Sequence, residues 1–302
     1  MHRTTDPTPE IVFATEREHT MSIVVTGASG HLGRLIVSSL LDRGIPAGEI
    51  VALGRDTDRL ADLADRGVTT RQADYTDPDS LRSAFAGADK LMFVSGSEIG
   101  QRIAQHRNVV AAAREAGVGL VVYTSIANAD RSGMILASEH LATEREIVGA
   151  GLPYVILRNG WYLENYTGQV PTYLQFGVTG SAGDGRVSAA TRADLAEAAA
   201  AALTGAAETN RVYELGGEAF TLTELAEEVS RQTGRAVGYT DLPVEKFTEV
   251  LVGAGLPEGF AAVLADSDRG LSRGALHVDG DDLAKLIGRR PTTLAEALRA
   301  VL

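Results

Sequence analysis

Three regularly spaced glycines lie between an apolar run and a helical pattern near the start of the chain. The apolar run at 23–26 predicts a buried strand, and Gly27, Gly30 and Gly33 follow it in a G-x-x-G-x-x-G spacing. The first glycine permits a tight turn, the second lets backbone N–H groups approach a pyrophosphate, and the third lets the helix pack closely on the strand. With 33 glycines such a spacing also arises by chance, but the strand–turn–helix context favours a dinucleotide-binding turn. The predicted contacts of this turn are Gly27, Ser29, Gly30, His31, Leu32 and Gly33.

Strand-like runs alternate with helical patterns along most of the chain. The predicted strands are Ile23–Thr26, Ile50–Gly54, Val68–Ala73, Leu91–Ser95, Leu120–Thr124, Tyr154–Arg158 and Val212–Leu215. Most of them are continuous apolar runs, as expected when helices cover both faces of a parallel sheet. Between them, Asp77 followed by Pro78 predicts the start of a helix that runs to about Ala86. An alanine-rich helix is predicted at 192–203. The alternation predicts an α/β fold with a doubly wound parallel Rossmann sheet.

The pattern becomes mostly helical after residue 217. Capping-box patterns at Thr221 and Thr293, each with glutamate three residues later, predict two amphipathic helices, and a short strand is predicted at 237–240. We therefore predict a Rossmann domain at 21–217 and a smaller, mostly helical C-terminal substrate lobe at 218–302. Within the first domain, residues 159–186 are expected to contribute to the substrate cleft.

The first 20 residues differ in character from the rest. Residues 1–20 contain two prolines, many charges and no apolar core long enough for a signal peptide. We predict a flexible N-terminal extension, with a mis-assigned start as the alternative, since Met21 immediately precedes the first strand.

Composition excludes several classes of protein. The absence of cysteine excludes disulfide scaffolds, zinc ribbons, iron–sulfur clusters and thiolate nucleophiles. The net charge of −12 argues against non-specific binding to nucleic acid or to an anionic membrane. No apolar run approaches the length of about 20 residues that a membrane helix needs, and the six histidines show no metal-ligand spacing. We expect a cytoplasmic protein without a metal, a membrane or a nucleic-acid partner.

The end of the second predicted strand bears on the choice of nucleotide. An acidic residue there would hold a ribose 2′-hydroxyl, but the strand ends with Arg55, whose guanidinium can hold a 2′-phosphate in bidentate fashion. Asp56 is a counter-argument, although it also fits the N-cap of the next helix. The pattern favours NADPH over NADH.

Two further strand ends are candidate cofactor contacts. Asp74 can accept a hydrogen bond from the adenine amino group, and Tyr75 can cover the ring. Ser95, Gly96 and Ser97 form a small flexible turn that would pass beneath the cofactor. The alternative for both segments is a simple loop.

The expected catalytic pair is missing. The arrangement resembles the short-chain dehydrogenase/reductase superfamily, in which the fifth strand delivers a serine and the next helix a Tyr-x-x-x-Lys pair. Ser125 fits the serine position, but Leu136 takes the tyrosine position and His140 the lysine position. The chain has only three lysines, and none follows a tyrosine by four positions: Lys90, Lys246 and Lys285. Hydride acceptors whose reduced form is already a stabilised anion, such as quinones or cationic dyes, need less help from a protein acid.

Long motifs carry a more specific resemblance. They are TGASGHLGR (26–34), RQADYTD (71–77), SGSEIGQR (95–102), QHRNVV (105–110), VYTS (122–125), SEHLATE (138–144), LRNGWYLENY (157–166), SAATRADLAEAAA (188–200), VYELGG (212–217), LADSDRG (264–270) and KLIGRRPTTLAEAL (285–298). With these motifs the chain resembles the NmrA-like atypical short-chain reductases, and most closely their NAD(P)H:quinone oxidoreductase type 2 group. Triphenylmethane reductases look similar over the same span, but the run at 158–162 favours the quinone group.

The resemblance implies NADPH-dependent reduction of quinones such as benzoquinone or naphthoquinones, by direct hydride transfer and without flavin. It adds Thr124 and Asn159 to the cofactor contacts and places Trp161 and Tyr162 at the nicotinamide end, where they would meet the substrate. For Trp161, the only tryptophan, core packing between the lobes is an equal alternative. Ser125, His140 and Tyr162 are then the candidate catalytic residues.

The roles of two histidines remain open. His140 could donate a proton or a hydrogen bond to a quinone oxygen, or it could be a helix-surface histidine paired with Glu144 one turn later. For His106, a position on a helix face or at a subunit contact is favoured over catalysis. A homodimer is expected from the superfamily alone.

Two other functions compete with this one. Some NmrA-like proteins are catalytically inactive NADP(H)-sensing regulatory proteins, and the missing Tyr-x-x-x-Lys pair fits them equally well. The Asn159–Tyr166 segment and the complete glycine turn favour the enzyme. A nucleotide-sugar epimerase is disfavoured by Leu136 and His140 in place of the catalytic pair.

Overall fold

A single parallel sheet lies at the centre of the structure, a computed structural model that describes residues 21–302. The predicted extension at 1–20 lies outside the described residues. Within the described part of the chain the sheet has seven strands, all parallel, in the order β3-β2-β1-β4-β5-β6-β8. The strands are β1 (Ile23–Val25), β2 (Ile50–Gly54), β3 (Thr69–Gln72), β4 (Lys90–Phe93), β5 (Leu120–Ile126), β6 (Tyr154–Asn159) and β8 (Arg211–Leu215). The predicted doubly wound sheet is confirmed, and each predicted strand overlaps an observed one.

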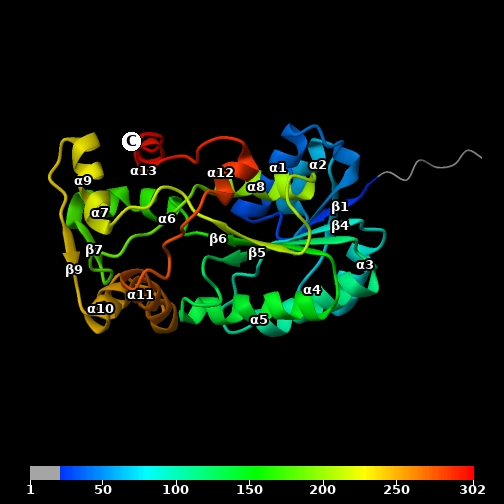
Figure 1. Cartoon of the computed structure of the whole chain (residues 1–302), viewed down its shortest axis with the longest axis horizontal. Coiled ribbons are helices and arrows are strands. Elements are labelled where there is room, and N and C mark those ends of the chain that lie inside the picture. The colour runs from blue at the N-terminus through cyan, green and yellow to red at the C-terminus, as the bar shows by residue number, and fades with distance from the viewer. Residues whose placement is uncertain (1–20) are drawn as a thin grey trace, which may run out of the picture.

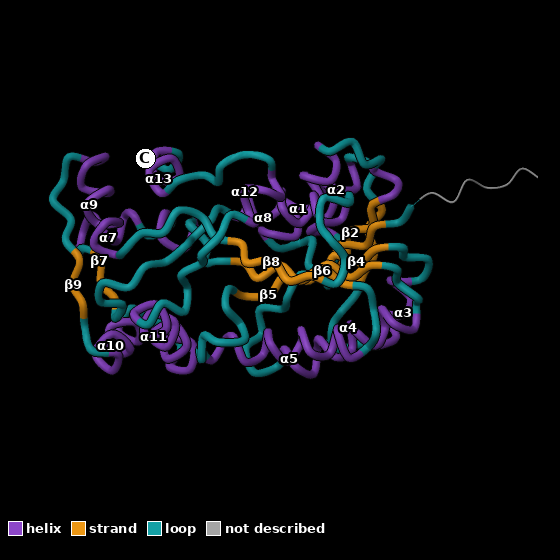
Figure 2. The backbone as a smooth tube through the Cα atoms, in the orientation of Figure 1, coloured by secondary structure: helices purple, strands orange, loops and turns teal. Residues whose placement is uncertain are grey.

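Helices cover both faces of this sheet (Figure 1). One layer contains α1 (His31–Asp42), α2 (Ala61–Asp65), α8 (Arg192–Leu203) and α12 (Asp282–Ile287). The other contains α3 (Pro78–Phe85), α4 (Arg102–Glu115) and α5 (Ile135–Gly149). Asp77 caps α3 as predicted, because its side chain accepts hydrogen bonds from the backbone N–H groups of Asp79 and Ser80. The tube view shows the strands enclosed between these two layers (Figure 2).

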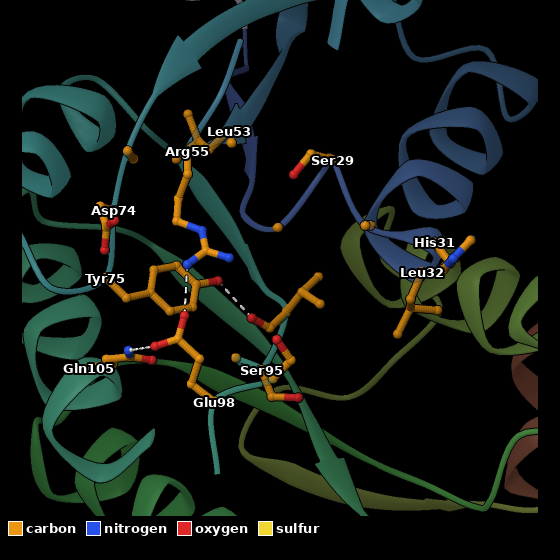
Figure 3. A pocket seen from close by; sticks show the side chains of 18 of the residues that line it. Ser29, His31, Leu32, Leu53, Arg55, Asp74, Tyr75, Ser95, Glu98 and Gln105 are labelled. Carbon is orange, nitrogen blue, oxygen red and sulfur yellow. Dashed lines mark hydrogen bonds and ion pairs between the residues drawn. The ribbon is translucent and has the colours of Figure 1, made fainter. Parts of the chain in front are cut away.

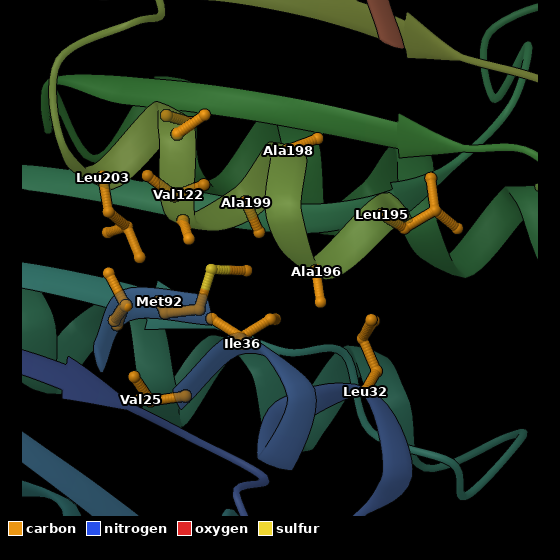
Figure 4. Packing of buried hydrophobic residues seen from close by; sticks show 14 of the residues in the cluster. Val25, Leu32, Ile36, Met92, Val122, Leu195, Ala196, Ala198, Ala199 and Leu203 are labelled. Atoms are coloured by element: carbon orange, nitrogen blue, oxygen red, sulfur yellow. The ribbon is translucent and has the colours of Figure 1, made fainter. Parts of the chain in front are cut away.

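The helix α8 is made of small side chains because it packs directly on α1 and on the sheet. Ala196, Ala198 and Ala199 are fully or almost fully buried. Figure 4 shows Ala196 opposite Leu32 and Ile36 of α1. Small residues let the helix axes approach closely, so this contact fixes α1, and with it the glycine turn, against the sheet.

The remaining elements form a lobe beyond the end of the sheet. It contains α6 (Glu164–Thr167), α7 (Val170–Phe176), β7 (Val178–Gly180), α9 (Leu222–Thr233), β9 (Tyr239–Asp241), α10 (Val244–Gly253), α11 (Glu258–Ser272) and α13 (Leu294–Arg299). Both predicted capping boxes are present, at Thr221 and at Thr293. The strand predicted at 237–240 is β9, which pairs in parallel with β7, a strand that the sequence did not predict. The helix α12 lies within 218–302 but returns to pack on α8 and β8.

The strand order places a candidate site at one edge of the sheet. The chain winds outward from β1 to β3 in one direction and from β4 to β8 in the other. Ligands of such sheets bind at the carboxyl ends of the strands where the order reverses, here between β1 and β4. Among the described residues, no helix combines the length and apolar character required to cross a membrane.

Candidate active site

The glycine turn joins β1 to α1 and exposes the start of that helix. Gly27 has a φ of 61°, which favours glycine, and its carbonyl oxygen accepts a hydrogen bond of 3.0 Å from the N–H of Gly30. A Cβ at Gly33 would overlap the backbone of Gly27 and Ala28. The first turn of a helix leaves N–H groups without intrahelical partners, so the turn and α1 present donors to a negatively charged group.

A cavity of about 400 Å³ opens beside this turn. It is lined by Gly27, Ser29, Gly30, His31, Leu32, Gly33, Leu53, Gly54, Arg55, Arg59, Ala73, Asp74, Tyr75, Val94, Ser95, Gly96, Ser97, Glu98, Gln105, Tyr162 and Arg192. All of the predicted cofactor contacts except Thr124 and Asn159 are in this set. The structure thus brings together side chains from four strand ends, although their role in binding stays a prediction. The sequence prediction missed Arg59, Gln105 and Arg192; the last two lie within motifs of the family resemblance, but nothing in those motifs assigned them to the cofactor.

Arg55 reaches across the cavity to a carboxylate (Figure 3). Its Nη1 lies 2.7 Å from Oε1 of Glu98, and Oε2 of Glu98 accepts a hydrogen bond of 2.8 Å from Nε2 of Gln105. Gln105 is buried, whereas Arg55 and Glu98 are exposed to solvent at the opening. The guanidinium that the sequence assigned to a 2′-phosphate therefore has a partner within the protein.

Asp74 and Tyr75 line the same cavity in different ways. Hydrogen bonds from the backbone N–H and the hydroxyl of Thr76 lower the pKa of Asp74, which keeps it an acceptor. The Tyr75 hydroxyl lies 2.6 Å from Oγ1 of Thr26 and 2.7 Å from the carbonyl oxygen of Val94. Burial raises the pKa of Tyr75, so it remains a phenol. Its hydroxyl is held by β1 and β4, which leaves its ring to line the cavity.

Two hydrogen bonds to the backbone of Gly96 fix the turn after β4. The N–H of Gly96 donates a 2.9 Å hydrogen bond to Nε2 of His106, and the carbonyl oxygen of Gly96 accepts one of 2.6 Å from Nε of Arg102. The N–H of Ser95 donates to Oγ1 of Thr124 at 2.9 Å. Thr124 thus supports the cavity from behind the residues that line it.

His106 lies on a helix face as predicted, but this is the inward face of α4, where it is a buried acceptor, so the predicted alternative of a subunit contact is wrong. It is 1% exposed, and its Nδ1 lies 2.8 Å from Oγ1 of Thr143, which itself donates to the carbonyl oxygen of Glu139. Burial, assisted by the charge of Arg102, lowers the pKa of His106 to about 3. The neutral ring then carries its proton on Nδ1 and accepts from Gly96 at Nε2.

His140 is buried as well, and the alternative of a helix-surface histidine paired with Glu144 is wrong. Its Nδ1 lies 2.9 Å from the hydroxyl of Tyr123, and burial places the pKa of His140 well below its usual value. A pattern of residues one helical turn apart could not show that both side chains face the sheet. The predicted contact of His140 with a quinone oxygen stays a prediction.

Glu144 is instead part of a buried ionic network at the ends of β5, β6 and β8. It receives two hydrogen bonds from Arg158, at 2.9 and 2.7 Å, and one from Ser125 at 2.5 Å. Nη1 of Arg158 also lies 2.8 Å from Asp130 and 3.0 Å from Glu214. Burial lowers the pKa of Arg158, but the hydrogen bonds and charges of Glu144 and Glu214 outweigh it, so the net shift is upward. Ser125 does not line the cavity, and its predicted catalytic role stays a prediction.

The segment after β6 contains the residues predicted for the nicotinamide end. Tyr162 lines the cavity, and the guanidinium of Arg192 lies 4.3 Å from the centre of its ring. Burial raises the pKa of Tyr162, although the charge of Arg192 opposes the shift. Asn159 is buried, and its Oδ1 has no hydrogen-bond partner within residues 21–302. Trp161 is partly buried against the apolar cluster of the lobe, which agrees with the packing alternative.

Within residues 21–302, no three histidine or acidic side chains are grouped so that they could hold a metal ion.

Comparison with known proteins agrees with this geometry. The NmrA-like family matches residues 19–296. Quinone oxidoreductase 2 of Escherichia coli is 48% identical over 278 residues, which cover 91% of this chain and 97% of that protein. The crystal structure of an NADPH-dependent quinone oxidoreductase from Escherichia coli complexed with NADPH has a TM-score of 0.90 at 47% identity, covering 92% of this chain and 99% of that one. Triphenylmethane reductase of Citrobacter sp., complexed with NADP(H), has a TM-score of 0.89 at 40% identity, covering 93% and 100%. The chain therefore belongs to the NmrA-like family.

Proposed function

We propose that this protein is an NADPH-dependent reductase that transfers a hydride directly from the nicotinamide to a quinone, without flavin. The observation that carries the proposal is the single cavity that runs from Arg55 past the glycine turn to Tyr162. Two relatives of similar architecture are named as a quinone oxidoreductase and a triphenylmethane reductase, and both quinones and triphenylmethane dyes are delocalised acceptors.

The residues present fit a dinucleotide. Because a Cβ at Gly33 would overlap the backbone of Gly27 and Ala28, the glycine lets α1 begin directly against the turn, where a pyrophosphate would meet backbone N–H groups. Arg55 and Arg59 place positive charge at the end of β2, where a 2′-phosphate would lie. The unpartnered buried Oδ1 of Asn159 is an acceptor of the kind that the carboxamide N–H of a nicotinamide would satisfy.

The protein residues then have a limited chemical task. When bound, the nicotinamide supplies the hydride. Tyr162 keeps its phenolic proton, because its pKa is raised, and can donate a hydrogen bond from Oη to an acceptor oxygen. The proposed place of Trp161 is beside the substrate ring, at the boundary with the lobe. No lysine–tyrosine pair is needed, since a reduced quinone is a stabilised phenolate that solvent can protonate.

Anaerobic mixing of the purified protein, NADPH and benzoquinone tests the proposal. Enzyme-dependent loss of nicotinamide absorbance relative to a protein-free blank supports it. Binding of NADPH without any oxidation across several quinones and dyes would instead support the alternative, a catalytically inactive NADP(H)-sensing regulatory protein.

Replacement of Arg55 by alanine tests the cofactor preference. We expect the dissociation constant for NADPH to rise by about tenfold or more, because a charge-assisted hydrogen bond to a phosphate contributes about 1.5–3 kcal/mol. The dissociation constant for NADH should change little. Equal losses for both nucleotides would refute the 2′-phosphate assignment. The homodimer and the cytoplasmic location expected from the sequence stay predictions.

A further inference from the structure

The structure places a carboxylate where the distinguishing phosphate of NADPH would bind. Glu98 Oε1 lies 2.7 Å from Nη1 of Arg55, the residue that we assign to the 2′-phosphate. NADPH and NADH differ only in that phosphate. A partner of Arg55 within the protein therefore affects the binding of NADPH and not the binding of NADH.

Glu98 is held in this position and is not a freely moving surface side chain. Its second oxygen, Oε2, accepts a 2.8 Å hydrogen bond from Gln105, which is only 6% exposed. Glu98 lies two residues after Gly96, whose N–H donates a hydrogen bond to His106 and whose carbonyl oxygen accepts one from Arg102. The pair in Figure 3 therefore spans the opening of the cavity from the end of β2 to the start of α4.

We propose that Glu98 is a selectivity residue, which pairs with Arg55 when no 2′-phosphate is present and must be displaced when NADPH binds. This inference rests on the proposed function. With NADH, Arg55 keeps its carboxylate partner and no charge is left unpaired. With NADPH, a phosphate monoester of about −1.5 to −2 charge competes with Glu98 for the same guanidinium and is repelled by it. Glu98 thus weakens the binding of NADPH and reduces the preference of the site for NADPH over NADH.

The test is a set of dissociation constants for NADPH and NADH, measured by titration calorimetry at one ionic strength. Glu98→Gln keeps the size of the side chain and removes its charge. We expect it to tighten NADPH by about two- to fivefold, as expected for the loss of an exposed competing ion pair, and to change NADH by less than about twofold. A matched control is Glu227→Gln, which removes the same charge from an exposed position on α9.

A double substitution separates competition from a general effect of charge. In an Arg55→Ala background, Glu98→Gln should lose most of its effect on NADPH. The inference is overturned if Glu98→Gln leaves NADPH binding unchanged or weaker, if Glu227→Gln has the same effect, or if the gain is undiminished without Arg55. A wild-type protein that binds no NADPH would overturn the proposed function itself, and this inference with it. Because the expected result is a gain in affinity, misfolding of the variant cannot imitate it.

Discussion

A fall in pH from 7 to 5 should destabilise the protein through its two buried neutral histidines. The pKa of His106 is lowered to about 3, and that of His140 is also well below its usual value, mainly by burial. In the unfolded chain a histidine has a pKa of about 6.5. Between these values the unfolded state binds more protons than the native state. Stability is therefore full above about pH 6.5 and is lost as the pH falls toward 3.

The expected size of this loss follows from the unfolded pKa alone, as long as the native value lies below 5. Protonation of one histidine stabilises the unfolded state by about 0.2 kcal/mol at pH 7 and by about 2 kcal/mol at pH 5. With its native pKa at about 3, His106 therefore removes about 2 kcal/mol from the free energy of unfolding over this interval. His140, whose pKa is also lowered by burial, should add to this loss.

Urea unfolding at pH 7 and at pH 5 measures this difference, in the wild type and in the variant His106→Gln. Glutamine offers Oε1 as an acceptor for Gly96 and does not titrate, so the loss should be smaller by about 2 kcal/mol in this variant. The quantity compared between the two proteins is the difference in free energy of unfolding between pH 7 and pH 5. The absolute value at pH 7 is not compared, because glutamine packs differently from histidine and changes the stability at that pH as well. His31→Gln, at an exposed imidazole, is the control and should leave the loss as in the wild type. If His106→Gln lost as much stability as the wild type, the assignment of His106 as a neutral buried acceptor would be refuted.

Three further substitutions test other parts of the structure. Gly33→Ala would force α1 away from the turn, and we expect NADPH binding to weaken by about a hundredfold or more, which fluorescence titration would show. Arg158→Met leaves the buried carboxylate of Glu144 without its cation and should lower the free energy of unfolding by about 3–5 kcal/mol in urea; a loss below about 1 kcal/mol would contradict the network. Tyr162→Phe should lower kcat for benzoquinone by up to about tenfold, the value of one hydrogen bond, and leave the dissociation constant for NADPH within about twofold. An unchanged kcat would remove Tyr162 from the reaction.

Local signals account for the parts of the fold that were predicted from sequence. The turn at 27–33, the cap at Asp77 and the capping boxes depend on residues within seven positions of each other. The parallel sheet followed from its long apolar runs, which are buried on both faces. The strand β7 was missed because three residues carry too little periodicity to distinguish a strand from a loop.

The parts of the site that sequence reasoning missed depend on contacts between distant segments. Arg55 and Glu98 are 43 positions apart, and His106 and Thr143 are 37 apart. Arg192 comes to lie over a tyrosine 30 positions earlier only because α8 begins beside the segment after β6. No periodic pattern links the two residues of any of these pairs. The sequence alone therefore could not show that they are in contact.

Three positions of α5 explain why the missing Tyr-x-x-x-Lys pair limits the chemistry. Leu136, His140 and Glu144 lie one helical turn apart on one face of the helix. Leu136 packs against the apolar cluster of the lobe, His140 contacts Tyr123, and Glu144 binds Arg158.

This face of α5 therefore stabilises the junction of sheet and lobe where related folds carry a proton donor. A carbonyl that becomes an alkoxide on hydride transfer would find no strong acid on this helix, whereas a quinone becomes a phenolate that needs none. We accordingly expect reduction of quinones and no measurable reduction of simple aliphatic ketones in the same NADPH assay. Efficient ketone reduction would show that another residue supplies the proton and that the packing role of α5 does not restrict the reaction.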